Sequence, residues 1–236
     1  MKDKDIILWD AKFETKYYDL DINRYLTDTT KKLPLWYKDI KLYDNFSIKR
    51  CPSFIELFKN SYTIISPTDF TLKFSKSKRS AKFLTSNENK EYLSLETHTI
   101  NPIDGIFQMN YFNPDFQNVK LSFPLAIRSK KGRIDAVMFS NFYYNPSYPL
   151  QAAPGVWPLI DDFTNQFNVN FFINWEIHKN LEVKKGDPLA LMYFPNGKPG
   201  LEKAYLKEEL HKNIHYRNDK ESGFYLKKMA KCPYNH

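Results

Sequence analysis

The chain has 236 residues, with a hydrophobic fraction of 42% and an aromatic fraction of 17%, enough apolar material for a sizeable core. Glycine occurs only 7 times, and neither a GxGxxG nor a GxxxxGK[ST] pattern is present, which excludes the two commonest nucleotide-binding loops. The formal net charge of +8 is compatible with a polyanionic partner, but the lysines are interleaved with Asp and Glu, which favours an ordinary solvated surface.

Short helices and a first pair of strands are expected near the N-terminus. Residues 33–37 predict a short helix that begins at a proline, and residues 51–60 predict a second one, with Ser53 as its cap. Residues 62–66 and 70–74 predict strands, because apolar and polar residues alternate in the second of them.

The middle of the chain predicts short strands rich in aromatic residues. Residues 75–90 form the most polar and basic window and predict an exposed loop or hairpin tip. Residues 119–127 and 134–139 flank a Lys-Lys-Gly turn at 130–132 and predict a β-hairpin.

Residues 155–194 predict two buried strands joined through a Lys-Gly-Asp turn at 185–187. Because side chains alternate along a strand, we expect one common core for five of them, namely Phe171, Ile173, Val183, Leu189 and Leu191.

The composition changes after Pro195, where residues 196–200 predict a linker and residues 202–216 are rich in good helix formers. The chain therefore divides into an N-terminal segment (1–60) that packs on the core, a β-rich core (61–195) and a basic, helical C-terminal tail (196–236).

Several short motifs stand in a recognisable order. These are Thr68-Asp69-Phe70, Arg128-Ser129, Gly155-Val156, Ile160-Asp161, Asn174 and residues 185–191. In that order they resemble the core of the dUTPase and dCTP-deaminase superfamily. The resemblance implies a mainly β protein, a β-clip-like barrel or sandwich, to which this chain adds short N-terminal helices and a C-terminal helical appendage.

The resemblance also implies roles for three residues. Asp161 would activate water for attack on a phosphate, and Ser129 and Arg128 would hold phosphate oxygens, with Mg²⁺ sharing their charge. No other catalytic or cofactor-binding residue is indicated.

Departures from that family argue against turnover. Residues 157–159 are an insertion in the family's turn, and Pro188 and Leu191 replace an Arg and a Gln of its strand. The tyrosine that stacks on deoxyribose has no clear counterpart, and a basic tail replaces the glycine-rich closing arm.

Most of the chain also resembles a family of uncharacterised proteins of tailed phages. The resemblance is carried by residues 33–37, 51–54, 65–69, 154–156 and 185–189. It implies no known activity, and it places the protein in the host cytoplasm or the virion.

Metal sites and membrane segments are not expected. Cys51 and Cys232 are far apart and belong to no CxxC motif, and His211 and His215 lack the Glu of a zinc-binding HExxH helix. Charges interrupt the first apolar residues, so no signal peptide is expected, and no apolar run approaches the ~18 residues of a membrane span.

The expected function is therefore binding or assembly, by a phage accessory or structural protein on a degenerate dUTPase-like core that needs no cofactor. Two alternatives stay open: a Mg-dependent nucleotide pyrophosphatase or deaminase-like enzyme, and a nucleic-acid-associated protein in which rings such as those at 142–144 stack on bases. The expected partners are further copies of the chain, with residues 202–236 in the contact, and other phage proteins. A nucleotide or nucleic acid is a partner only under the two alternatives, and no membrane is expected.

Overall fold

The computed structural model describes residues 5–11, 21–41, 47–75, 80–84, 94–97, 116–141, 144, 150–174 and 180–206. These residues are mainly β, as the sequence predicts. The strands are β1 (Ile6–Ala11), β2 (Leu26–Asp28), β3 (Ser61–Ile65), β4 (Phe70–Ser75), β5 (Ser80–Leu84), β6 (Ser94–Thr97), β7 (Phe116–Ser129), β8 (Arg133–Ser140), β9 (Gln151–Ala152), β10 (Gly155–Ile160), β11 (Asn165–Asn174), β12 (Asn180–Val183), β13 (Pro188–Tyr193) and β14 (Gly200–Lys203). The helices are α1 (Leu35–Asp39) and α2 (Pro52–Lys59), with 3-10 turns at Ile22–Arg24, Thr29–Lys31 and Ile48–Arg50.

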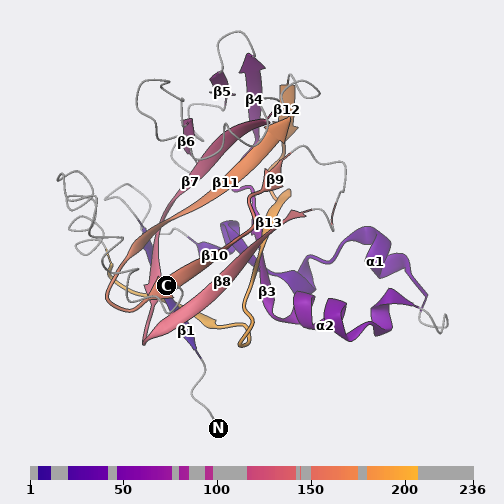
Figure 1. The fold of residues 1–236 in the computed structure, drawn as a ribbon, viewed down its shortest axis with the longest axis vertical. Helices are drawn as coiled ribbons and strands as arrows, with labels where there is room; N and C mark the ends of the chain where they lie inside the picture. The colour runs from indigo at the N-terminus through magenta and orange to yellow at the C-terminus, as the bar shows by residue number, and fades with distance from the viewer. Residues whose placement is uncertain are drawn as a thin grey trace, which may run out of the picture.

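The strands form three sheets in the described part of the chain. The first sheet has the order β14-β1-β7-β11-β9, with β6 also beside β7; the second has the order β10-β8-β13-β3-β2; the third has the order β12-β4-β5. Figure 1 shows β7 and β11 running side by side through the body, with α1 and α2 projecting on one side. Strands β1 and β14 pair in parallel, and the other strand pairs are antiparallel.

One hydrophobic core joins the inner faces of these sheets. Strand β11 illustrates how the sequence builds it, because Phe167, Val169, Phe171 and Ile173 are buried while the residues between them are less so. Each such side chain, when fully buried, contributes about 1.5–3 kcal/mol to folding. The alternation of apolar and polar residues therefore fixes which face of β11 meets the core.

A bent two-stranded ribbon connects the first and second sheets. Strands β7 and β11 pair in the first sheet, and their continuations β8 and β10 pair in the second. The predicted hairpin between residues 119–127 and 134–139 is therefore wrong, because β7 and β8 follow one another through a tight turn but belong to different sheets. A turn signal shows where the chain changes direction, but the partner of each strand depends on distant residues.

A β-bulge changes the predicted orientation of one core residue. Phe171, Ile173, Val183 and Leu189 belong to the core, as predicted. Leu191 is completely buried but lies on the opposite face of β13, because its neighbours Ala190 and Met192 face the core. The register shifts between Pro188 and Ala190, and such a bulge reverses a simple alternation.

The two N-terminal helices form as the sequence predicts, except for one cap. Helix α2 begins at Pro52 with Cys51 at the N-cap position, so Ser53 lies inside the helix and does not cap it. The ring of Phe58 meets that of Tyr37 edge-on, with centroids 5.0 Å apart, and this contact holds α1 against α2; Phe54, also in α2, meets Phe58 at 6.0 Å.

The first residues of the predicted C-terminal helix are a strand instead. Glu202 and Lys203 lie in β14, which pairs with β1, and Leu206 is then buried against Leu8 and Ala126. Pairing with an available strand edge outweighs the helix propensity of these residues. Residues 202–206 therefore fold onto their own domain, and the rest of the predicted tail lies outside the described residues, as do His211 and His215.

Within the residues that the structure describes, every helix is too short or too polar to span a lipid bilayer.

Candidate functional site

The three residues that the resemblance singles out meet at the bend of the ribbon. Arg128 and Ser129 end β7, and Asp161 follows β10. The guanidinium of Arg128 donates from Nη1 to the main-chain oxygen of Asp161 at 2.5 Å, and the N–H of Gly132 donates to Oδ2 of Asp161 at 2.7 Å. The Ser129 hydroxyl donates to the main-chain oxygen of Gly132 at 2.5 Å. The sequence therefore located residues that come together in space.

At this bend, which we call the ribbon corner (128–133 and 160–164), the three side chains bind main-chain groups. Ser129 is completely buried, and its hydroxyl donates a hydrogen bond within the turn that follows it. That hydroxyl is therefore not presented to a phosphate. Gly132 has a φ of +63°, in the left-handed region that favours glycine. The chain passes from the first sheet to the second at two places in the corner, and main-chain polar groups there have no partner in a neighbouring strand. The three side chains supply hydrogen bonds to these groups.

The ribbon corner does not fit the magnesium ion that the family chemistry would use. Mg²⁺ takes oxygen ligands in octahedral geometry, usually carboxylates and water. Of the two carboxylates of the corner, Asp161 and Asp162, the first already accepts a hydrogen bond, and the cationic Arg128 lies beside it. In the described ranges, no group of three or more His, Cys, Asp or Glu residues is placed to hold a metal ion.

A second feature is a pocket of about 310 Å³ between the two main sheets. Its lining comes from β8, β10, β11 and the link before β10, and consists of Met138, Ala153, Pro154, Gly155, Val156, Trp157, Asn168, Val169 and Asn170. Trp157 stacks on Phe167, with ring centroids 5.6 Å apart and an angle of 21° between the rings. Since no lining residue is charged, the pocket suits an uncharged group.

Sequence reasoning treated residues 157–159 only as an insertion in the family's turn and so missed this pocket. Trp157 could have indicated the pocket from the sequence. It is a large aromatic residue between Gly155-Val156 and a proline, in a strand that lies at a sheet edge.

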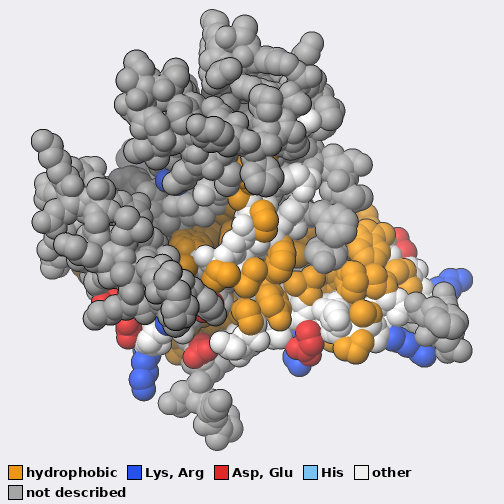
Figure 2. All heavy atoms as spheres, viewed as in Figure 1, with side chains coloured by type: hydrophobic (Ala, Val, Ile, Leu, Met, Phe, Trp, Pro, Cys, Tyr) orange, Lys and Arg blue, Asp and Glu red, His pale blue; other side chains and the backbone are white. Residues whose placement is uncertain are grey.

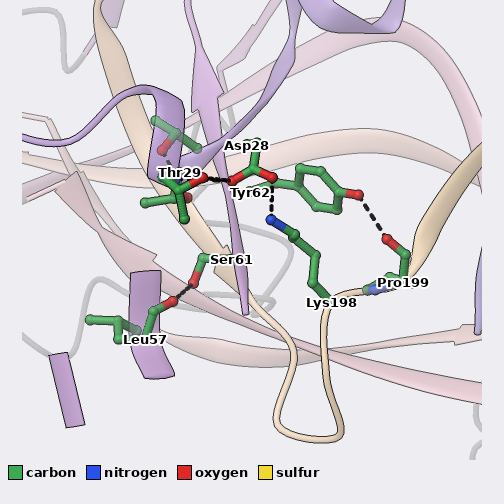
Figure 3. A network of polar contacts seen from close by, with 9 residues as sticks. Asp28, Thr29, Leu57, Ser61, Tyr62, Lys198 and Pro199 are labelled. Atoms are coloured by element: carbon green, nitrogen blue, oxygen red, sulfur yellow. Dashed lines mark hydrogen bonds and ion pairs between the residues drawn. The ribbon is translucent and has the colours of Figure 1, made fainter. Parts of the chain in front are cut away.

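A polar clamp joins the β13–β14 link to the second sheet (Figure 3). The carboxylate of Asp28 forms an ion pair with Lys198 and accepts hydrogen bonds from the N–H and hydroxyl of Thr30, at 3.0 and 2.7 Å. The Tyr62 hydroxyl donates to the main-chain oxygen of Pro199 at 2.7 Å, and the Lys198 ammonium lies 5.5 Å from the Tyr62 ring centroid. The clamp thereby fixes the end of the link that leads into β14.

The clamp shifts the pKa of two of its members. Burial alone would raise the pKa of Asp28, but the hydrogen bonds from Lys198 and Thr30 and the charge of Lys198 outweigh it, and the pKa lies below the ordinary 3.8. Burial, with a smaller effect from the charge of Asp28, raises the pKa of Tyr62 to about 12. Tyr62 therefore stays protonated at neutral pH and acts as a hydrogen-bond donor.

The outer face of the second sheet presents half-exposed apolar side chains. In the strand register Val137 lies between Val156 on one side and Tyr193 on the other, and Phe139 lies in the adjacent row. Val156 is 59% exposed, and the rings of Phe139 and Tyr193 lie 6.2 Å apart. Figure 2 shows hydrophobic side chains gathered over the region where β8, β10 and β13 lie in Figure 1. We call these four residues the Val137 face.

Comparison with known proteins adds no relative to these observations, because the chain matches no family model and no curated protein sequence.

Proposed function

We propose that this protein works by binding and assembly rather than by turnover, as an accessory or structural protein of a tailed phage. The phage setting, and with it a location in the host cytoplasm or the virion, rests on the sequence resemblance. The proposed β-clip-like character of the core is supported by the sharply bent ribbon of β7–β11 and β8–β10.

The observation that carries this proposal is the bonding of the ribbon corner. Asp161, Ser129 and Arg128, which would handle water and phosphate in a dUTPase-like enzyme, each bind main-chain groups of the corner. Catalysis through them would require these hydrogen bonds to break, and each such bond contributes about 0.5–1.5 kcal/mol to stability. The residues therefore support a fold-stabilising role, while the apolar outer face of the second sheet provides surface for binding.

A dUTP hydrolysis assay tests the proposal directly. The protein is incubated with dUTP and Mg²⁺, and pyrophosphate release is followed for the unmodified chain and for Asp161→Asn. We expect both to remain at background. Release above background that Asp161→Asn abolishes would overturn the proposal and favour the enzyme alternative.

A further inference from the structure

We infer that the pocket between the two main sheets binds an uncharged sugar. Its volume of about 310 Å³ lies at the small end of the range for ligand sites, about 300–1,000 Å³, so the pocket suits a mono- or disaccharide. The inference goes beyond the proposed function, because it assigns a ligand to a pocket to which the ribbon corner contributes no residue.

One part of the pocket wall is an edge of β11 that no strand covers among the described residues. Strand β11 has β7 on one side and β9 on the other, and β9 covers only Phe171 and Phe172. The main-chain oxygen of Asn170 accepts a hydrogen bond from the Ala153 N–H at 2.8 Å, so the main-chain groups of Asn170 point to the β9 side. Because these directions alternate along a strand, the N–H and C=O of Asn168 point to the same side. The uncovered edge therefore offers a ligand one main-chain donor and one main-chain acceptor.

Two asparagine side chains add hydrogen-bonding groups to this wall. Asn168 donates from Nδ2 to the main-chain oxygen of Gln166 at 3.1 Å, which leaves its Oδ1 and its second amide hydrogen for a ligand. Asn170 lies two residues further along β11 and is exposed. A side-chain amide both donates and accepts, as a sugar hydroxyl does, so the two kinds of group can pair in either direction.

The rest of the lining is apolar and includes an aromatic ring whose orientation is fixed. Trp157 lines the pocket and stacks on Phe167, with ring centroids 5.6 Å apart. Met138 and Val169 add aliphatic surface beside it. The C–H groups of a sugar ring carry a partial positive charge and are attracted to the electron-rich face of an aromatic ring. Apolar surface together with uncharged amides thus matches the two chemical characters of a sugar.

The lining argues against three other kinds of occupant. A phosphate or nucleotide would call for a cationic partner, and in the described part of the chain no lysine or arginine lines the pocket. A lipid chain would cover the polar groups of Asn168 without replacing their hydrogen bonds to water. A peptide that extends the sheet needs a run of free edge groups, whereas the main-chain oxygens of Gln166 and Asn170 already accept hydrogen bonds.

Saturation-transfer NMR on the full-length chain tests the inference. The probes are glucose, galactose, mannose and N-acetylglucosamine, with glucuronic acid as a charged sugar and uracil as an uncharged base. We expect at least one uncharged sugar to bind with a dissociation constant on the order of 1 mM, as for a small ligand with few contacts. Glucuronic acid should bind more weakly, because no cation in the lining offsets the loss of hydration of its carboxylate. Binding of uracil alone, tighter binding of glucuronic acid, or binding of no probe would overturn the inference.

Amide-to-carboxylate variants test whether the sugar binds in this pocket. Asn168→Asp and Asn170→Asp each remove a donor without changing the size of the side chain, and each should weaken binding roughly tenfold. Asn170 is exposed, so its variant should fold even if Asn168→Asp does not. Asn180→Asp, the same change at an exposed position of β12 in the third sheet, is the matched control and should bind like the unmodified chain.

Sugar binding that neither pocket variant weakens would overturn the inference, as would an equal loss in Asn180→Asp. The dUTP assay is independent of these measurements. A chain that binds no sugar and does not hydrolyse dUTP overturns only this inference, whereas hydrolysis overturns the proposed function.

Discussion

The Asp161 carboxylate accepts a hydrogen bond from the N–H of Gly132 at 2.7 Å, across 29 positions of sequence. This bond links the β7–β8 connection to the β10–β11 connection, the two places where the ribbon passes from the first sheet to the second. The Arg128 guanidinium holds the same crossing through the main-chain oxygen of Asp161. The ribbon can bend at this point because side-chain hydrogen bonds satisfy main-chain groups that lose their strand partners at the bend.

Removal of the Asp161 carboxylate should therefore lower stability. We expect Asp161→Ala to reduce the free energy of unfolding by about 0.5–1.5 kcal/mol, the net contribution of one hydrogen bond, because water can reach the exposed Gly132 N–H in the variant. Asp161→Asn is the matched control, because its side-chain oxygen can still accept, and its loss should be smaller. Urea denaturation followed by circular dichroism measures both, and equal stability of Asp161→Ala and the unmodified protein would contradict the role given to the corner.

Gly132 should resist substitution for a conformational reason alone. Its φ is +63°, and no heavy atom lies within 4 Å of the position that a Cβ would take, so Gly132→Ala introduces strain without a clash. We expect a loss of roughly 1–2 kcal/mol, the cost of a left-handed conformation for an L-residue. Gly155→Ala is the control, because Gly155 has equally open space and no positive φ. If a chemical denaturation experiment gives both variants the same free energy of unfolding, the left-handed conformation assigned to Gly132 is wrong.

The local pattern of the sequence was enough to predict several strands. Alternation or an apolar run marks β3, β4, β8 and β13, and their positions agree with the structure within a few residues. The sheet to which each strand belongs was not predictable in the same way. The turn at 130–132 carries an ordinary hairpin signal, yet the strands beside it find their partners in different sheets, because distant strands compete for the same edges.

The candidate site was likewise predictable only in part. The resemblance located Arg128, Ser129 and Asp161, which do come together, but it could not show that their polar groups bind the main chain. The polar clamp was invisible for another reason. Asp28 and Lys198 are 170 positions apart, and neither belongs to a motif, so only the folded chain brings them into contact.

Leu191 should be as important to stability as a residue of the main core, although it faces away from it. The side chain is completely buried, so Leu191→Ala should cost about 2–5 kcal/mol through lost burial and the cavity left behind. Val156→Ala is a control on the neighbouring outer surface, where 59% exposure predicts only a small effect. Thermal unfolding of the two variants compares them, and an unchanged melting temperature for Leu191→Ala would contradict its burial.

The polar clamp should make stability depend on pH in the acid range. The pKa of Asp28 is lower in the folded protein than its ordinary value of 3.8, so its ionised form is stabilised by folding. This contribution is fully present above about pH 4–5 and is lost as the pH falls through the lowered folded-state value, because both states then bind the proton. Asp28→Asn should therefore be less stable than the unmodified protein at pH 7, and the difference should shrink towards pH 2–3. Lys198→Gln is the matched control, since it removes the other partner of the ion pair while Thr30 still donates to Asp28. Urea denaturation at several pH values measures the effect, and a stability difference between Asp28→Asn and the unmodified chain that stays constant from pH 7 to pH 2 would show that the Asp28 carboxylate is not stabilised by the clamp.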